Sequence, residues 1–234
     1  MNIVVLCKTR NEEENIAQFC KSYAFADKIL VADAESTDNT VAIARSFSNV
    51  VVRPYIDLIE FGGAYYSHHS RHLNFLFDWA EDYHPDWLIS DDTDSFPTRA
   101  LSKDARFNLE HAPYDWDAVF LRRYYVWYTD NFSWYFPQLD VGRSMWAWRP
   151  ARCEIHCDEN DPNSLIHPNF INYPAGMGEQ WKWNDPYRLL HYWYRSEEHL
   201  ARKTRDYSVR GVELAHPLQR CGELQKLPSW AFPV

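Results

Sequence analysis

Three aspartates, Asp91, Asp92 and Asp94, directly follow a short apolar run in the segment DWLISDDTDSFPT, residues 86–98. Carboxylates gathered at the end of a buried strand repel one another, so they either spread into solvent or hold a positive charge among them. Residues two apart in an extended segment point to the same side, which would let Asp92 and Asp94 face one divalent cation. Carboxylate oxygens suit Mg²⁺ and Mn²⁺. The alternative is a solvated turn that needs no metal.

Two further polar segments follow apolar runs earlier in the chain. The run NIVVLC leads into TRNEEEN, residues 9–15, and the run DKILVAD ends at Asp33 before AESTDNT. Ligands bind beyond the carboxyl ends of the strands in open parallel sheets, so the three polar segments would meet at one edge. Asp33 suits a hydrogen bond to a nucleobase or a ribose hydroxyl, and alternatively a helix cap or a turn.

The first hundred residues alternate between strand-like and helix-like patterns. Short apolar runs predict four buried strands, at residues 2–7, 27–33, 49–53 and 86–90. Helices are expected to begin at Asn11 and at Ser36 or Thr37, and a longer one to cover residues 65–83. This alternation indicates an α/β fold with a Rossmann-like, mostly parallel central sheet and helices on both faces.

The second half of the chain has weaker signals. Its expected elements are two strands of a mixed sheet, a long loop and a late helix, at residues 116–128, 143–149, 150–180 and 186–205. The length suits one domain over residues 1–234, with a soft internal boundary near residue 100.

Composition and charge disfavour several classes of protein. A formal net charge of −9 and a pI near 5.5 argue against broad binding to duplex DNA. No apolar run approaches the roughly 18 residues of a membrane span, and the N-terminus lacks a signal-peptide pattern. The five cysteines are an odd number, which argues against a disulfide framework. We therefore expect a cytoplasmic protein without a membrane span.

Several segments, in order, resemble the family 2 glycosyltransferases: TRNEEENI, FADKILVADAESTDNTVAIA and RHLNFLFDWAEDYHPDWLISDDTDSF. The resemblance covers the first hundred residues and is nearest to the lipopolysaccharide-core glucosyltransferase-like branch. It implies a GT-A fold, a nucleoside diphosphate sugar donor, with UDP expected, and a Mn²⁺ or Mg²⁺ cofactor. It also implies that residues 1–100 bind the nucleotide sugar and that residues 101–234, a mixed-sheet and loop half, bind a hydroxyl-bearing acceptor.

The resemblance assigns roles to individual residues of the first half. Asp33 matches a base-contacting aspartate, and Asp92 and Asp94 match a metal-binding D-x-D motif. Arg71 matches a basic residue that faces the donor diphosphate, which Asp92 also approaches. The rest of the expected donor site is Thr9, Arg10, Asn11 and Glu12. Glu35 departs from the family, which usually has glycine at that position.

The second half matches the family only in fragments. The segment LLHYWYRSEE resembles a late family segment and would bring His191 to the metal or to a phosphate. An inverting transfer, which the resemblance implies, needs a base for the acceptor's proton. Glu179 is the first candidate and Asp158 the second, with Glu159 and Asp140 as rivals. Aromatic side chains offer stacking area to sugars, and the expected acceptor contacts are Trp146, Trp148 and Trp181.

Three other functions remain open. In a non-catalytic carbohydrate- or nucleotide-binding module on the same fold, the clustered aspartates would have a structural role only. A nucleotidyltransferase would need a glycine-rich phosphate loop after the first strand, where LCKTRNEEEN has no glycine. A glycosyltransferase acting on modified bases of phage-type DNA would need only a short basic strip, which Arg143, Arg149 and Arg152 would supply.

Overall fold

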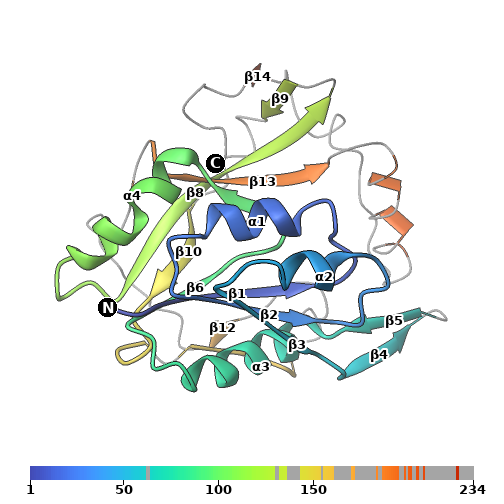
Figure 1. Cartoon of the computed structure of the whole chain (residues 1–234), viewed down its shortest axis with the longest axis horizontal. Helices are drawn as coiled ribbons and strands as arrows, with labels where there is room; N and C mark the ends of the chain where they lie inside the picture. Colours follow the sequence, from blue (N-terminus) through green and yellow to red (C-terminus); the bar gives the residue numbers. More distant parts are fainter. Residues whose placement is uncertain are drawn as a thin grey trace.

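The structure is a computed structural model, and it has a large central sheet with helices on both sides (Figure 1). It describes residues 1–61, 64–129, 132–135, 143–153, 155–160, 170–171, 183, 186–194, 198, 200–201, 204–205, 208 and 225–226.

Four parallel strands form the first half of this sheet, as the apolar runs predict. They are β1 (Ile3–Thr9), β2 (Lys28–Asp33), β3 (Val50–Pro54) and β6 (Trp87–Ser90), in the spatial order β3-β2-β1-β6. Continuous apolar runs form such strands because helices bury both faces of a parallel sheet.

Four helices cover these strands. They are α1 (Ile16–Ser22), α2 (Thr40–Ala44), α3 (His69–Glu81) and α4 (Arg99–Glu110). The side chains of β1 alternate between two cores: Ile3, Val5 and Cys7 pack with α1, α2 and α4, and Val4 and Leu6 pack with α3. Figure 1 shows α3 on the opposite side of the parallel strands from α1 and α2. This alternation also decides which way the polar residues beyond each strand point.

Three helices begin later than the sequence predicts. Asn11 does not cap α1, because its backbone φ of 52° is left-handed and its side chain accepts a hydrogen bond from the amide of Thr37. Similarly, α2 begins at Thr40, beyond the predicted cap at Ser36 or Thr37. The residues before α3 form a hairpin of β4 (Leu58–Phe61) and β5 (Ala64–Ser67), which the helical prediction over 65–83 missed.

The second half extends the same sheet. The predicted strands appear as β8 (Ala118–Thr129) and β10 (Arg143–Trp148), and β10 lies antiparallel between β6 and β8. The helix expected from residue 186 is wrong at its start, where β13 (Arg188–Tyr194) pairs with β8 and with β7 (Ser95–Pro97). Shorter strands are β9 (Phe132–Tyr135), β11 (His156–Cys157), β12 (Phe170–Ile171) and β14 (Gln225–Lys226).

These pairings confirm the predicted α/β class. The first half is a Rossmann-like parallel sheet with helices on both faces, and the second half continues it as a mixed sheet. No helix within the described ranges is long and apolar enough to cross a membrane.

Candidate functional site

Three strands of the parallel half end side by side at one edge of the sheet. The register pairs Thr9 with Asp33 between β1 and β2, and Leu6 with Ser90 between β1 and β6. The polar segments that follow these strands therefore emerge together, as predicted. This edge is where parallel α/β sheets bind ligands.

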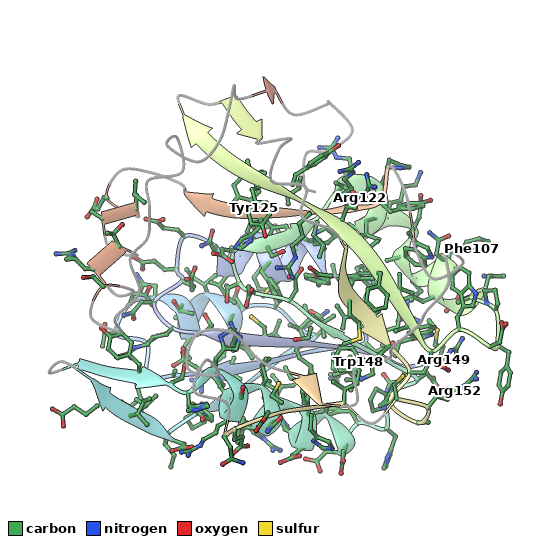
Figure 2. The ribbon with its side chains drawn as sticks, turned by 180° about the vertical axis from the view of Figure 1, so that it is seen from behind. Phe107, Arg122, Tyr125, Trp148, Arg149 and Arg152 are labelled. Carbon is green, nitrogen blue, oxygen red and sulfur yellow. The ribbon has the colours of Figure 1, made fainter. Side chains whose placement is uncertain are left out.

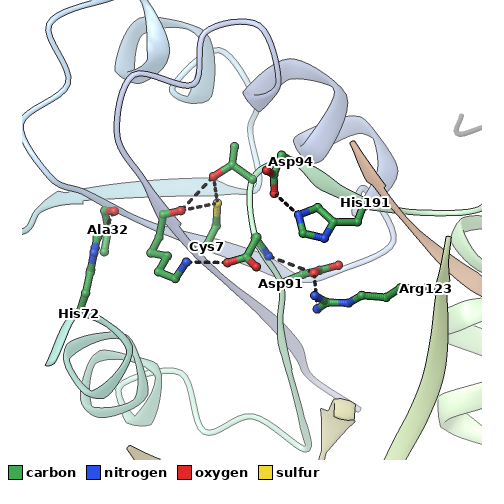
Figure 3. A network of polar contacts seen from close by, with 10 residues as sticks. Cys7, Ala32, His72, Asp91, Asp94, Arg123 and His191 are labelled. Atoms are coloured by element: carbon green, nitrogen blue, oxygen red, sulfur yellow. Dashed lines mark hydrogen bonds and ion pairs between the residues drawn. The ribbon is translucent and has the colours of Figure 1, made fainter. Parts of the chain in front are cut away.

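The first aspartate of the cluster, Asp91, points into the core on the α1 side. Its carboxylate is fully buried, and its Oδ2 accepts a hydrogen bond of 2.6 Å from the hydroxyl of Tyr23. Its Oδ1 lies 3.3 Å from Nη2 of Arg123, a residue of β8 (Figure 3). Burial is the largest influence on the pKa of Arg123 and lowers it, but the carboxylates of Asp91 and Asp92 and the neighbouring tyrosines together outweigh burial and raise the pKa, so the guanidinium stays charged. Asp91 therefore anchors the loop after β6 and is not exposed to a ligand.

The second aspartate, Asp92, points to the opposite side because successive residues of an extended chain alternate. Its Oδ1 lies 2.5 Å from Nζ of Lys8, which continues the α3-facing row of Val4 and Leu6 in β1. Burial is the largest influence on the pKa of Asp92 and raises it, but the Lys8 ammonium together with other nearby positive groups outweighs burial and holds the pKa below its usual range. Asp92 is therefore ionised and already paired with a protein cation.

The third aspartate, Asp94, does not lie in an extended segment with Asp92. The chain turns between them, with the amide of Ser95 donating to the carbonyl of Asp92 at 2.9 Å. Asp94 faces β13 instead: its carbonyl accepts from the amide of Tyr192, and its Oδ1 lies 3.3 Å from Nε2 of His191 (Figure 3). The prediction from period-two spacing is thus wrong in its geometry. His191 lies beside Asp94, and its approach to a metal ion or a phosphate remains a prediction.

The side chains of this cluster suit a divalent cation only in part. In the described part of the chain, no three His, Cys, Asp or Glu side chains converge closely enough to form a metal site. Asp94 and His191 are adjacent, and Asp92 contributes a second carboxylate whose Oδ1 is engaged by Lys8. Mg²⁺ usually takes only one or two protein carboxylates and completes its shell with phosphates and water, so Asp92 and Asp94 are suitable ligand types. An imidazole also suits Mn²⁺. Joint binding of one ion by Asp92, Asp94 and His191 would require Lys8 to release Asp92, and it remains a prediction.

The loops after β1 and β2 are held together by hydrogen bonds centred on Ser36. Its hydroxyl donates to Oδ1 of Asp33 and accepts from the amide of Asn11 at 2.9 Å, and its amide donates to Oδ2 of Asp33. Asp33 is 6% exposed, and its carboxylate shapes the turn. The turn role considered from sequence is therefore present, and contact with a nucleobase remains a prediction.

The same two loops are joined further along by backbone-to-side-chain bonds. The amide of Glu12 donates to Oγ1 of Thr40, and the amide of Glu13 donates to Oδ2 of Asp38. In return, Oε2 of Glu13 accepts from the amide and the side chain of Asn39. The backbone amides of Glu12 and Glu13 and the carboxylate of Glu13 thus hold the loop after β2 against the loop after β1.

Thr9 and Arg10 lie at the end of β1. Thr9 is buried, and its hydroxyl has no hydrogen-bond partner among the residues that the structure describes. The guanidinium of Arg10 lies 5.8 Å from the ring centre of Tyr66 in β5, so the hairpin β4–β5 reaches this edge of the sheet.

The side chain of Arg71, which was predicted to face the donor diphosphate, is paired with two carboxylates of the chain itself. Its guanidinium lies 3.5 Å from Asp57 and 3.6 Å from Glu159, and its side chain is 43% exposed. The next residue of α3, His72, points elsewhere, and its Nε2 lies 3.0 Å from the carbonyl of Ala32 (Figure 3). Arg71 therefore joins α3 to its neighbouring loops through these two carboxylates, and its contact with a diphosphate remains a prediction.

The predicted acceptor tryptophans that the structure describes are core residues. Trp146 is fully buried and donates from Nε1 to the hydroxyl of Tyr23 at 3.2 Å, and Trp148 is 2% exposed with its ring edge-on to Phe77. Neither presents a face on which a sugar could stack, so the role expected of them does not fit. The third, Trp181, lies outside the described residues.

Of the two candidate bases, only Asp158 lies within the described part of the chain. Glu179 lies outside the described residues, as does its rival Asp140. Asp158 follows β11, a strand packed against α3, and its Oδ1 accepts from the amide of Asn160 at 2.9 Å. Its role as a base remains a prediction.

Two arginines of the basic strip considered for DNA, Arg149 and Arg152, lie at the other end of the sheet, whereas the backbone of Arg143 begins β10 and pairs with Arg122 of β8. Trp148 pairs with Leu88, near the start of β6, so the residues after it lie away from the acidic cluster. The guanidinium of Arg149 stacks 4.3 Å from the ring centre of Trp87, and Arg152 forms an ion pair of 2.7 Å with Asp117. Figure 2 shows Arg149 and Arg152 beside Trp148, apart from Tyr125 further along β8. Arg149 and Arg152 therefore do not line the candidate site.

Sequence reasoning missed three residues of this site, Lys8, Tyr23 and Arg123. The signal for Lys8 was present, because a charged residue that ends an apolar strand must project beyond the buried core. Tyr23 and Arg123 carried no local signal, because they meet Asp91 only when α1 and β8 pack beside β6.

Comparisons with known proteins find structural likeness only. No protein-family model matches the chain, and no curated protein sequence matches it. S. aureus TarS, residues 1–349, aligns with 70% of this chain at 19% identity and a TM-score of 0.47. The chain spans about half of that structure, 53% of its length.

A second solved structure of similar shape is glucosyl-3-phosphoglycerate synthase from Mycobacterium tuberculosis. In complex with Mn²⁺, UDP and glucosyl-3-phosphoglycerate it aligns with 53% of this chain and 44% of its own, at 17% identity and a TM-score of 0.37. The same enzyme with Mg²⁺ and UDP aligns with 53% of this chain and 43% of its own, at 17% identity and a TM-score of 0.37.

Proposed function

We propose that the chain is a glycosyltransferase that moves a sugar from a nucleoside diphosphate sugar, with UDP as the expected nucleotide, to a hydroxyl acceptor. The observation that carries this proposal is the gathering of Lys8, Asp92, Asp94 and His191 where β1 and β6 end. A cation and two carboxylates at this edge suit a site that handles a diphosphate. The resemblance of the first hundred residues to family 2 glycosyltransferases supports the same reading.

The donor would lie along the joined loops after β1 and β2. Asp33 would bind the base or the ribose, and the unsatisfied hydroxyl of Thr9 would gain a partner from the nucleotide. Arg10 beside Tyr66, and Arg71 after exchanging its carboxylate partners, would contact phosphate oxygens. Asn11 and Glu12 would act indirectly, because their described bonds hold the two loops in register.

The transfer itself requires a base and a stabilised leaving group. The acceptor oxygen forms a bond to the anomeric carbon, the bond from that carbon to the diphosphate breaks, and the diphosphate leaves with the electron pair. A carboxylate takes the acceptor proton, with Glu179 as the first candidate and Asp158 as the second. A Mn²⁺ or Mg²⁺ ion held by Asp92, Asp94 and His191 would neutralise charge on the leaving diphosphate. We propose inversion at the anomeric carbon, following the resemblance.

One observation favours a second candidate, a non-catalytic binding module. Each aspartate of the cluster has a cationic or imidazole partner from the chain itself: Arg123 for Asp91, Lys8 for Asp92, and His191 for Asp94. Such pairing is also what purely structural carboxylates would show. Sugar transfer or donor hydrolysis that is lost in Asp92→Asn would exclude this candidate.

The test is a thermal-shift panel of nucleoside diphosphates and nucleotide sugars, with and without Mn²⁺. A ligand at 100 times its dissociation constant adds about 2.7 kcal/mol of stability, or roughly 5–10 °C in melting temperature for a chain of this size. We expect a Mn²⁺-dependent shift with UDP or UDP-sugars that Asp92→Asn abolishes. The matched control is Asp78→Asn, the same substitution at an exposed position of α3, which should keep the shift. A panel without any shift would contradict the proposed donor site.

A further inference from the structure

We propose that Lys8 is a protein-supplied cation of the donor site, which holds Asp92 until a divalent ion arrives and then contacts the donor diphosphate. This inference rests on the proposed function for its second step only. The first step, competition between an ammonium and a metal ion for one carboxylate, concerns the chain and the ion alone. The two steps can therefore be tested separately.

The geometry places Lys8 directly on the carboxylate that a metal ion would need. Nζ of Lys8 lies 2.5 Å from Oδ1 of Asp92, and the two side chains are 19% and 35% exposed. The pair is thus formed at the margin of the core, where an incoming ion can reach it. A lysine sealed in the interior could not exchange its partner in this way, because an unpaired buried charge is costly.

A metal ion and an ammonium cannot both sit against the same oxygen of Asp92. Two cations at contact distance repel strongly outside bulk water. Arg123 cannot exchange in the same way, because it is held by the fully buried carboxylate of Asp91. Lys8 is therefore the cation that yields when a metal ion binds to Asp92.

The displaced ammonium remains at the edge of the sheet, where the donor diphosphate would lie. Lysine carries its charge on a flexible four-carbon stem, so Nζ can move while the backbone of β1 stays in the sheet. Hydrogen bonds between an ammonium and phosphate oxygens are among the strong, charge-assisted kind. Lys8 would therefore stabilise the bound diphosphate from the β1 side, and Asp92 would face the metal.

The first experiment measures Mn²⁺ alone, by isothermal titration calorimetry and by the electron paramagnetic resonance signal of free Mn²⁺. We expect Lys8→Met to bind Mn²⁺ about tenfold more tightly than the wild type. The double variant Lys8→Met, Asp92→Asn should lose this gain. Lys103→Met, which removes an exposed lysine of α4, controls for the change in net charge. Equal Mn²⁺ affinity in the wild type and Lys8→Met would overturn the competition.

The second experiment measures UDP at saturating Mn²⁺, where the effect should have the opposite sign. We expect Lys8→Met to bind UDP about tenfold more weakly than the wild type, and Lys8→Arg to recover most of the affinity. A general loss of folding would weaken the binding of both Mn²⁺ and UDP. Tighter Mn²⁺ binding together with weaker UDP binding in the same variant would therefore identify the exchange of Lys8 from Asp92 to the diphosphate. If Lys8→Met has a lower melting temperature than the wild type, Lys8→Gln replaces it in both binding experiments.

Each failure has a distinct meaning. Unchanged or tighter UDP binding in Lys8→Met would overturn the contact with the diphosphate. If the wild type binds Mn²⁺ but no nucleoside diphosphate, the proposed function and that contact both fail, whereas the Mn²⁺ measurement still decides whether Lys8 competes for Asp92.

Discussion

The hydroxyl of Tyr23, at the end of α1, donates a 2.6 Å hydrogen bond to the buried carboxylate of Asp91, 68 residues further along the chain. The same hydroxyl accepts from Nε1 of Trp146 in β10, so one phenol joins three elements of the fold. This contact fixes Asp91 in the core and sends the next residue, Asp92, to the opposite face. The sides of the sheet to which Asp91 and Asp92 point thus depend on a tyrosine outside the acidic cluster.

Tyr23→Phe should destabilise the protein by about 1–3 kcal/mol, because the buried carboxylate and the indole N–H each lose a partner. Urea unfolding, followed by tryptophan fluorescence, would measure the change in the free energy of unfolding. Tyr114→Phe removes the hydroxyl of a tyrosine that is 85% exposed and should change stability by less than about 0.5 kcal/mol. Equal effects of the two substitutions would contradict the role of the Tyr23 hydroxyl.

Ser36→Ala should loosen the joined loops after β1 and β2. The substitution leaves the amide of Asn11 without its acceptor and removes one of the two donors to Asp33, at a cost of about 1–2 kcal/mol. Amide hydrogen exchange should become faster at Asn11 and Thr37 while the core of β1 stays protected. Ser48→Ala, at an exposed position after α2, is the matched control. Unchanged exchange at Asn11 would show that Ser36 does not join the loops.

Glu35→Gly should stabilise the protein slightly. Glu35 has a φ of 56°, a left-handed conformation that costs a residue with a Cβ about 1–2 kcal/mol. Glycine removes that cost but gains entropy in the unfolded chain, which offsets about 0.4–1 kcal/mol. We expect a net gain of about 0.5–1 kcal/mol in urea unfolding. Glu35→Ala removes the same charge but keeps the Cβ, and a similar gain there would refute the conformational explanation.

The stability of the protein should depend on pH through His72. Burial, with a smaller contribution from Lys8, lowers the pKa of His72 to about 3, whereas the unfolded chain has the ordinary value near 6.5. Between these values the unfolded state binds a proton that the native state does not, so stability falls as the pH falls from about 6.5 toward 3, by up to about 1.4 kcal/mol per pH unit.

His72→Gln tests this dependence, because glutamine can still donate to the carbonyl of Ala32 but does not titrate. The free energy of unfolding would be measured by urea at several pH values between 4 and 8 for both proteins. The difference between wild type and variant should shrink or reverse as the pH falls, since only the wild type loses the contribution of His72. Parallel curves would contradict a neutral, buried His72.

Much of the fold is readable from local patterns. The four apolar runs predict β1, β2, β3 and β6, because a strand buried on both faces cannot tolerate polar residues along its length. The meeting of their polar continuations at one edge follows from parallel strand order alone. Glu35, flagged as a departure from glycine, indeed has the left-handed φ that glycine adopts without strain.

Other elements depend on contacts that no local pattern contains. The segment RLLHYWY has apolar side chains that suit either a helix or a strand, and it becomes β13 because β7 and β8 provide backbone partners on both sides. Trp146 and Trp148 could face a ligand or the core by type alone, and the packing of β10 on β6 and β8 buries them.

Local sequence patterns are enough to predict the α/β class, the edge at which the polar segments gather and the presence of an acidic cluster after β6. The partner of each aspartate depends on how the whole chain packs: Tyr23 and Arg123 for Asp91, Lys8 for Asp92, and His191 for Asp94. Apolar periodicity is set by local burial, whereas the partner of a charge is set by which distant strands and helices lie beside it once the chain has folded.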